Sequence, residues 1–314
     1  MRALHAYPPD AAAHVRLLVE DAPDPVPGPT DALVRVEAVG LTKDELTWLD
    51  AFNHPADTVR PPSVPGHELA GVLRTVPPTA RGLSAGDPVW GLIAFDRDGA
   101  AAESVAVTAA DLARRPAALS ATAAAALALT GLTAWQALHT QAGLRAGQHV
   151  LVLGAGGSVG SVALQVAKAA GARVTAAARA RHHDRLRQLG ADAVIDTDST
   201  AIHAGIRDVD IALDAAGPHA HLDAIRRIKV GGTLVSVTVP PDDRAQARAR
   251  EAGVRATYFV VEPNAAHLDR LAGLVVSGRL RAPTTHTVTL ADAAGIFDDT
   301  GHAPSGIKTV LDLG

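Results

Sequence analysis

The hydrophobic pattern of the chain changes near residue 121. Before that point, short apolar runs are separated by turns rich in Pro and Gly, and they favour a small, barrel-like β domain. The strands are expected at residues 15–19, 32–39, 69–76 and 88–93. Strand-like segments return at residues 287–290 and 309–313, and we expect them to rejoin this first domain.

From residue 121 onward, helical and strand-like segments alternate. An alanine-rich helix is expected over residues 121–129, followed by a connection at 130–133. Further strands are expected at 150–153, 173–178, 193–195, 209–213, 233–237 and 255–261, with helices at 159–170, 182–189 and 222–228. The repeated β–α order predicts an α/β domain with a doubly wound parallel sheet, which binds its ligand at the carboxyl ends of the strands.

A glycine-rich turn separates the apolar strand at residues 150–153 from the amphipathic helix that follows. Small residues in such a turn let the backbone approach a pyrophosphate, whose charge the N–H groups of the helix N-terminus stabilise. A glycine pattern alone is weak, but its place between this strand and this helix predicts a dinucleotide site. The expected contacts are Ala155, Gly157, Ser158, Val159 and Gly160.

The end of the second strand indicates which dinucleotide is bound. A site for NAD usually has an acidic residue there to hold the ribose hydroxyls, whereas this segment contains Ala178, Arg179 and Arg181. An arginine can bind a 2′-phosphate through a planar, charge-assisted fork. We therefore expect NADPH, with Arg179 as the main contact and Arg181 as support. The alternative is that both arginines are ordinary solvated residues at a helix start.

Composition limits the remaining classes of protein. The chain of 314 residues is long enough for two domains, and its formal net charge of −4 argues against general nucleic-acid binding. It contains no cysteine, which excludes disulfides and thiolate metal sites. We find neither a signal peptide nor a run of about 18 apolar residues without charge. A cytoplasmic protein without a membrane span is expected.

Eight short motifs occur in an order and spacing that together are specific. They are Val39–Asp44, Pro65–Gly71, Gly86–Gly91, Leu129–Trp135, the glycine-rich turn, Leu189–Asp196, Asp214–Gly217 and Gly231–Val235. On these motifs the chain resembles the medium-chain dehydrogenase/reductase superfamily, and most closely its zinc-free quinone oxidoreductase branch. The resemblance implies a GroES-like catalytic domain (1–120 and 263–314), an inserted Rossmann domain (121–262) and a substrate cleft at their junction. It also implies a homodimer.

The zinc-dependent branch of this superfamily binds its catalytic metal through two cysteines and one histidine. Here Thr42 and Leu129 stand at the two cysteine positions, and only the histidine remains, as His67. A catalytic zinc needs three protein ligands in a tetrahedral array plus an open position, and the other histidine pairs, at 182–183 and 219–221, lie in the wrong domain. We therefore expect no metal, with His67 as a packed or hydrogen-bonded residue.

Without a Lewis acid, reduction of a simple ketone loses its main charge stabiliser, whereas a quinone or an enone accepts hydride more readily. The favoured function is a zinc-independent, NADPH-dependent reductase of a quinone or α,β-unsaturated carbonyl. A dedicated enoyl reductase of a secondary-metabolite pathway is the nearest alternative. A non-catalytic NADPH-binding sensor or scaffold is an alternative of another class.

The candidate catalytic residues follow the second predicted strand. Thr42 is expected to hydrogen-bond the nicotinamide carboxamide or the substrate, although an asparagine often stands at this place in the branch. Lys43 is expected to polarise an oxygen or deliver a proton if burial lowers its pKa, or else to begin a solvated helix together with Asp44. Trp48 is expected to form a flat wall for a ring, or to pack in the core.

The resemblance implies further contacts with the cofactor. Thr130 would border the nicotinamide, with a helix-ending role as the alternative. Lys308 would reach the phosphates, or else lie on the surface. The residues expected beneath the ribose and nicotinamide are Gly217, Val237, Thr238 and Val239.

Overall fold

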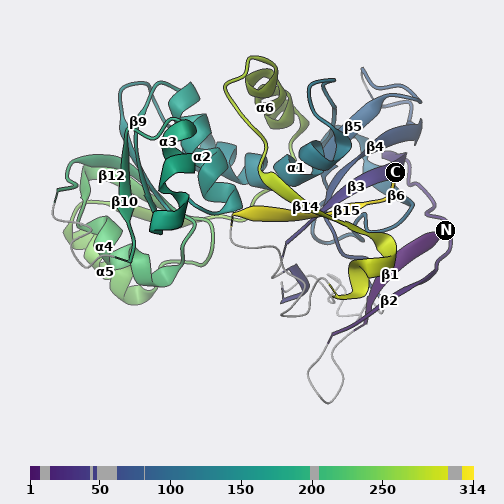
Figure 1. Cartoon of the computed structure of the whole chain (residues 1–314), viewed down its shortest axis with the longest axis horizontal. Helices are drawn as coiled ribbons and strands as arrows, with labels where there is room; N and C mark the ends of the chain where they lie inside the picture. The colour runs from purple at the N-terminus through teal and green to yellow at the C-terminus, as the bar shows by residue number, and fades with distance from the viewer. Residues whose placement is uncertain (8–14, 43–44, 48–61, 81, 199–204, 296–305) are drawn as a thin grey trace. The chain divides into compact units, whose positions relative to one another are not determined.

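The computed structural model describes the chain except residues 8–14, 43–44, 48–61, 81, 199–204 and 296–305 (Figure 1). The chain forms two compact units. The first, here called the β unit, comprises Met1–Leu129, Glu262–Val276 and Ala282–Gly314. The second, here called the Rossmann unit, comprises Thr130–Val261 and Ser277–Arg281. The first boundary therefore falls inside helix α1 (Ala121–Trp135) and not before it.

The Rossmann unit is built on a parallel sheet, six-stranded in its described part, in the order β10-β9-β8-β11-β12-β13. In chain order this is 3-2-1-4-5-6, the order of dinucleotide-binding doubly wound sheets, and it confirms the predicted fold class. The strands are β8 (His149–Leu153), β9 (Arg173–Ala178), β10 (Ala193–Asp196), β11 (Val209–Asp214), β12 (Ile228–Ser236) and β13 (Arg255–Tyr258).

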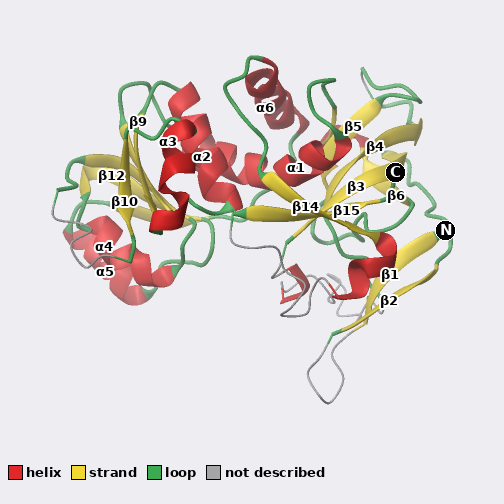
Figure 2. Cartoon of the chain, in the orientation of Figure 1, coloured by secondary structure: helices red, strands yellow, loops and turns green. Residues whose placement is uncertain are grey.

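Helices cover both faces of this sheet. Figure 2 shows α2 and α3 together on one side and α4 and α5 together on the other. The core between the sheet and α4 and α5 includes Leu151, Leu234, Ile225 and Ala245, all nearly inaccessible to solvent. Burial of one such leucine or isoleucine stabilises the fold by about 1.5–3 kcal/mol. The helices are α2 (Ser158–Ala169), α3 (His183–Gln188), α4 (His221–Ile225) and α5 (Asp243–Glu251).

The β unit contains a two-stranded sheet, β1-β2, and a larger sheet in the order β14-β15-β3-β4-β5-β7, with β6 also paired to β3. Its core includes Leu4, Val34, Leu69, Ile93 and Leu311. The strands are β1 (Arg2–Tyr7), β2 (Arg16–Asp21), β3 (Asp31–Leu41), β4 (Glu68–Thr75), β5 (Pro88–Leu92), β6 (Ser104–Thr108), β7 (Leu112–Arg114), β14 (Thr284–Thr289) and β15 (Ile307–Asp312).

The two ends of the chain meet in the β unit. Strand β15 pairs antiparallel with β3, and Thr309 lies opposite Leu41. The C-terminal strands therefore rejoin the N-terminal domain, as expected. The sequence patterns did not predict β1, β6, β7, α5 or α6 (Ala265–Val276).

The prediction of a connection at residues 130–133 is wrong. Helix α1 runs through this segment to Trp135, and a π-helical stretch, η3 (Gln136–Gln141), extends it. The 21-residue helix is long and apolar enough to cross a membrane by length and composition, contrary to expectation, but 72% of its most apolar window is buried within the protein. It therefore has the burial of a core helix.

Candidate functional site

In the glycine-rich turn between β8 and α2, backbone atoms lie so close to two glycines that a side chain would not fit there. Gly154 has φ +70°, and a Cβ on it would lie 2.5 Å from the carbonyl oxygen of Ala215 after β11. A Cβ on Gly160 would overlap the carbonyl oxygen of Gly154. The sequence pattern identified Gly160 but missed Gly154, whose signal is its place directly after a buried strand.

The accessible part of the turn is the N-terminus of α2. Gly157 precedes the helix with an extended backbone, and Ser158 and Val159 are partly exposed, whereas Ala155 and Gly160 are buried. The N–H groups of a first helical turn carry partial positive charge, and this one contains no acidic residue. The buried positions therefore shape the turn, and the exposed ones can hold a pyrophosphate.

The end of β9 presents the expected arginines to solvent. Ala178 is the buried last residue of the strand, and the Arg179 and Arg181 side chains are exposed. Asp198, which the sequence reasoning missed, lies 3.8 Å from the Nε atom of Arg179, with both side chains mostly exposed. Such an exposed ion pair contributes about 0–1 kcal/mol, so it leaves Arg179 available to a stronger anion.

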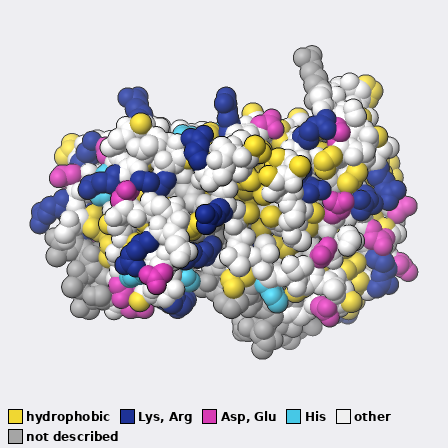
Figure 3. Space-filling model, turned by 45° about the horizontal axis from the view of Figure 1, so that its top comes forward, with side chains coloured by type: hydrophobic (Ala, Val, Ile, Leu, Met, Phe, Trp, Pro, Cys, Tyr) yellow, Lys and Arg dark blue, Asp and Glu magenta, His cyan; other side chains and the backbone are white. Residues whose placement is uncertain are grey.

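Lys and Arg outnumber Asp and Glu in the Rossmann unit, although the whole chain has a formal net charge of −4. On the face drawn in Figure 3, Lys and Arg side chains lie scattered over the unit, with acidic side chains among them. This surplus of positive charge favours a polyanionic ligand.

A buried aspartate organises the loops after β11 and β12. Asp214 is fully buried and accepts hydrogen bonds from the N–H groups of Ala216 (2.9 Å) and Gly217 (3.2 Å). Its second oxygen contacts His221 Nε2 (3.0 Å) and accepts from the hydroxyl of Thr238 (3.3 Å). These bonds fix two of the segments predicted to lie beneath the cofactor, the one at Gly217 and the one that contains Thr238.

The structure excludes the alternative role of Thr130 and places Val237 and Val239 where they were expected. Thr130 lies inside α1 with only 1% of its surface exposed, so a helix-ending role is wrong. Val237 and Val239 flank Thr238 after β12, at the carboxyl end of the strand. Their contacts with a nicotinamide stay predictions.

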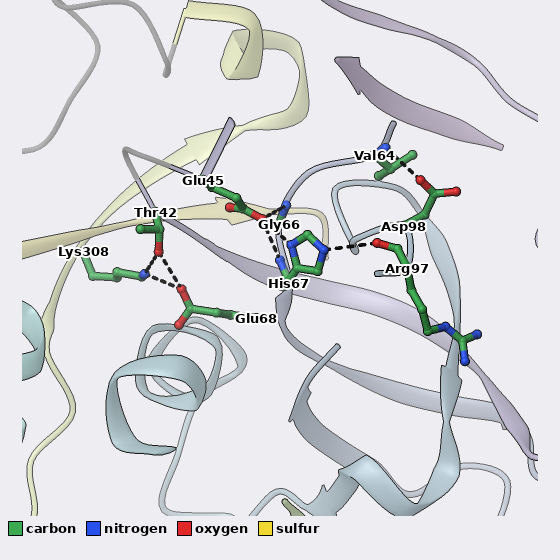
Figure 4. Close-up of polar contacts among 9 residues, drawn as sticks. All are labelled: Thr42, Glu45, Val64, Gly66, His67, Glu68, Arg97, Asp98 and Lys308. Atoms are coloured by element: carbon green, nitrogen blue, oxygen red, sulfur yellow. Dashed lines mark hydrogen bonds and ion pairs between the residues drawn. The ribbon is translucent and has the colours of Figure 1, made fainter. Parts of the chain in front are cut away.

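The β unit contains a group of buried charged side chains, here called the charge cluster: Glu45, His67, Glu68 and Lys308 (Figure 4). Their exposed fractions are 3%, 7%, 1% and 6%. Glu45 begins the short helix η1 (Glu45–Thr47), His67 precedes β4, and Lys308 belongs to β15. The pairing of β15 with β3 brings Lys308 beside Thr42, which directly follows β3.

Glu68 and Lys308 form a buried ion pair within the cluster. Lys308 Nζ also donates to the hydroxyl of Thr42 (2.8 Å), and that hydroxyl donates a longer bond to Glu68 Oε1 (3.4 Å). The other oxygen of Glu68 accepts the N–H of Leu129 (3.1 Å). Burial raises the pKa of Glu68 even though the Lys308 charge opposes the shift. Lys308 is therefore no surface lysine, and in this structure its ammonium binds side chains rather than facing solvent.

Glu45 and His67 form the second pair. Glu45 Oε1 lies 2.5 Å from His67 Nδ1 and accepts the backbone N–H of Gly66 (2.7 Å). His67 Nε2 faces the carbonyl oxygen of Arg97 at 3.2 Å. Since both partners are acceptors, both ring nitrogens donate, and His67 is an imidazolium. Burial opposes the charge of both groups, but their mutual attraction outweighs it, which raises the pKa of His67 and lowers that of Glu45.

This arrangement does not fit a catalytic zinc. A histidine ligand must offer a free lone pair, and both nitrogens of His67 are engaged with acceptors. Thr42 and Leu129 occupy the cysteine positions, and the Glu68 carboxylate is held by Lys308 and a backbone N–H. Within the described parts of the chain, no group of three or more His, Asp or Glu side chains is placed to hold a metal ion.

The Glu45–His67 pair predicts a pH-dependent stability. Glu45 has a lowered pKa, so its contribution is present above the ordinary value of 4.5 and is lost as pH falls through the lowered value. His67 has a raised pKa, so its contribution is complete below 6.5 and is lost as pH rises through the raised value. The difference in melting temperature between wild type and Glu45→Gln is therefore expected to be largest between pH 4.5 and 6.5 and to shrink toward pH 9.

Glu37→Gln is the matched control for this measurement. Glu37 is paired with Arg35 and Arg115, whose guanidinium groups stay charged at high pH. Its effect on the melting temperature should not shrink between pH 6.5 and 9. A Glu45→Gln effect that is constant over the same range would contradict the charged state assigned to His67.

Lys43 and Trp48 lie outside the described residues, and their roles stay predictions. Thr42 is partly exposed and is the candidate catalytic side chain whose contacts the structure describes. The sequence reasoning identified His67 and Lys308 but missed Glu45 and Glu68 as their partners. The Gly-His-Glu element at residues 66–68 contains a signal for Glu68, whereas nothing in the local pattern distinguishes Glu45.

Two family models match the chain. One, described as zinc-binding dehydrogenase, matches residues 158–260, and the other, described as alcohol dehydrogenase GroES-like domain, matches residues 28–117. These ranges correspond to the Rossmann unit and to the N-terminal part of the β unit.

Individual proteins are similar over most of the chain. A probable zinc-binding mitochondrial oxidoreductase of Arthroderma benhamiae is 30% identical over 279 residues, 84% of this chain and 83% of that protein. A 2-methylene-furan-3-one reductase of Solanum lycopersicum is 33% identical over 231 residues, 70% of this chain and 55% of that protein. The solved structure of the quinone oxidoreductase from Coxiella burnetii covers 100% of this chain and 99% of its own, with 27% identity and a TM-score of 0.86.

The chain belongs to the medium-chain dehydrogenase/reductase superfamily and is quinone oxidoreductase-like. It is therefore an oxidoreductase with a small-molecule substrate and a nicotinamide cofactor.

Proposed function

We propose that this protein is a zinc-independent reductase that uses NADPH to reduce a quinone or an α,β-unsaturated carbonyl. The charge cluster is the observation that supports the proposal most. Where the zinc-dependent branch places a metal with three protein ligands, this chain has the Thr42 hydroxyl backed by the Lys308 ammonium, and a histidine already engaged on both nitrogens. Electron-poor acceptors are the class that such a site can serve without a Lewis acid.

The residues of the Rossmann unit fit the cofactor. The first turn of α2 would hold the pyrophosphate, Arg179 and Arg181 would hold the 2′-phosphate, and the loop at Gly217 would support the ribose. When bound, the nicotinamide of NADPH supplies the hydride.

Thr42 is the proposed hydrogen-bond donor to the acceptor oxygen. Its hydroxyl accepts from Lys308 Nζ at 2.8 Å, and among the described residues its own proton makes only the long bond of 3.4 Å to Glu68. A proton held this weakly can turn to a stronger acceptor, such as an oxygen that gains negative charge during hydride transfer. The buried Lys308 ammonium polarises the hydroxyl from behind.

Thr42→Val is expected to lower kcat by about 10²-fold, because loss of one hydrogen-bond donor to a developing oxyanion costs about 10²–10³-fold in kcat. The KM for NADPH should change little. Steady-state kinetics with a quinone as acceptor measure both parameters, and Thr42→Ser, which keeps the hydroxyl, should retain most of kcat. If Thr42→Val is as active as wild type while Lys43→Ala is not, the donor is Lys43.

A dedicated enoyl reductase is the second candidate, and the similarity to the 2-methylene-furan-3-one reductase favours it. The substrate in that protein's name carries a carbon–carbon double bond conjugated to a carbonyl. Both candidates use the same hydride geometry and differ in the acceptor.

The experiment that tests the proposal follows NADPH consumption with a panel of quinones, enones, simple ketones and aldehydes. Turnover with quinones or enones, and little with simple ketones, is expected. Selective turnover of enones would favour the enoyl reductase. Saturable NADPH binding without turnover of any acceptor would contradict the proposal and favour a non-catalytic sensor or scaffold.

We also propose that the protein is a homodimer, because members of the branch that it resembles are commonly dimers. Size-exclusion chromatography with light scattering tests this, and a mass near 32.1 kDa would contradict it.

A further inference from the structure

His182 lies between the glycine-rich turn and the arginines at the end of β9. It is the last residue of the short helix η4 (Ala180–His182), and its backbone N–H donates to the carbonyl oxygen of Arg179 at 2.9 Å. Its ring lies directly against Gly156, where a Cβ would be only 2.6 Å from His182 Cδ2. The imidazole therefore packs on the backbone of the turn, and the function considered so far gives it no role.

The charged groups nearest to this ring are basic. Burial lowers the pKa of His182, and the charges of Arg181, Arg185, Arg179 and His183 lower it further. Two acidic side chains of the same region have other partners: Asp184 binds Arg187 at 2.8 Å, and Asp198 lies 3.8 Å from Arg179. His182 is therefore held as a neutral imidazole at neutral pH in the absence of ligand.

We propose that His182 is a specificity-determining residue that takes up a proton when the 2′-phosphate of NADPH binds between the glycine-rich turn and Arg179. NADH, which has a hydroxyl at this position, does not cause the uptake. The inference rests on the proposed use of NADPH and adds a residue and a proton to its recognition.

His182 lies where a 2′-phosphate is expected in this fold. In doubly wound sheets the pyrophosphate lies on the turn after the first strand, and the 2′ position of the adenosine ribose lies at the end of the second strand. In this unit those places are the start of α2 and Arg179, and the His182 ring lies between them. A 2′-phosphate bound at Arg179 is therefore a neighbour of the ring.

A bound 2′-phosphate would change the charge around His182. A phosphate monoester carries a charge of about −1.5 to −2 at pH 7, with its second pKa near 6. It would bring a strong negative charge to a ring whose nearest charged neighbours, among the described residues, are basic. A negative neighbour favours the imidazolium. At pH 7.5 the phosphate is already almost fully ionised, so a proton taken up from the buffer on binding has to be bound by a group of the protein.

Isothermal titration calorimetry at pH 7.5, in two buffers with different ionisation enthalpies, measures the number of protons taken up. Wild type is expected to take up a substantial fraction of one proton with NADPH and close to none with NADH. His182→Gln should abolish the uptake with NADPH. His183→Gln is the matched control, because His183 bonds the Ala178 carbonyl oxygen at 3.0 Å, and it should keep the uptake.

Direct binding measurements give a second readout. Because binding of NADPH takes up one proton, its affinity should fall by up to about tenfold for each unit by which pH rises, whereas the affinity for NADH stays nearly constant. His182→Gln should flatten the NADPH profile, and its melting temperature checks that the variant is folded.

The outcomes separate the inference from the function on which it rests. If NADPH binds more tightly than NADH but without proton uptake, or if His182→Gln keeps the uptake, the inference is wrong and the cofactor assignment stands. If NADH binds as tightly as NADPH at every pH, the cofactor assignment is wrong and the inference fails with it.

Discussion

Lys308→Met is expected to lower the free energy of unfolding of the β unit by about 3–5 kcal/mol, the usual cost of removing one partner from a buried ion pair. Lys308 and Glu68 are 6% and 1% exposed, so water cannot replace the lost ammonium. The carboxylate would keep its bonds from Thr42 and Leu129, which do not neutralise its charge. Thermal and chemical unfolding of the full chain measure the loss.

The double variant Lys308→Met/Glu68→Gln separates charge from packing. It should recover most of the lost stability, because a neutral amide can still accept the Leu129 N–H. The single variant should also lose more stability as pH rises. Without Lys308 the pKa of Glu68 rises further, so the folded state binds a proton that the unfolded state releases above 4.5. A pH-independent loss, or no recovery in the double variant, would contradict the ion-pair assignment.

Arg179→Asp is expected to weaken NADPH binding by at least about 10²-fold. A hydrogen bond to a charged group contributes about 1.5–3 kcal/mol, the new carboxylate repels the phosphate, and each 1.4 kcal/mol corresponds to tenfold in affinity. NADH binding should change by less than about threefold, because an aspartate can accept hydrogen bonds from the hydroxyls of its ribose. The KM values for both cofactors measure this difference.

Arg187→Asp is the control for this variant. Arg187 is an exposed arginine of the neighbouring helix α3 and is paired with Asp184. The substitution makes the same change of charge away from the end of β9, and both KM values should stay near those of wild type. Equal effects of Arg179→Asp on NADPH and NADH would show that Arg179 is an ordinary solvated arginine.

The fold could be predicted where local patterns and global packing agree. The alternating strands and helices after residue 121 were sufficient for the doubly wound sheet. The helix break expected at Thr130 and Gly131 was wrong. That prediction used the local preference of these residues for turns, whereas burial of the apolar helix determines their conformation. Residues with weak apolar periodicity, such as those of α5, gave no helix prediction.

The site could be predicted only in part. Local spacing identified the glycine-rich turn and the arginines after β9. The charge cluster depends on contacts between distant segments: Lys308 reaches Thr42 and Glu68 because β15 pairs with β3, and no local pattern contains that pairing. Glu45 and His67 are also 22 positions apart in the sequence, so their shared proton could be recognised only from the geometry.

Hydride transfer without a metal is the central claim, and one measurement tests it most directly. NADPH oxidation by a quinone is followed with protein that has been treated with a chelator and shown by elemental analysis to contain no zinc. Full turnover that added zinc does not increase is the predicted result. Loss of turnover on chelation, with recovery when zinc is restored, would contradict the account.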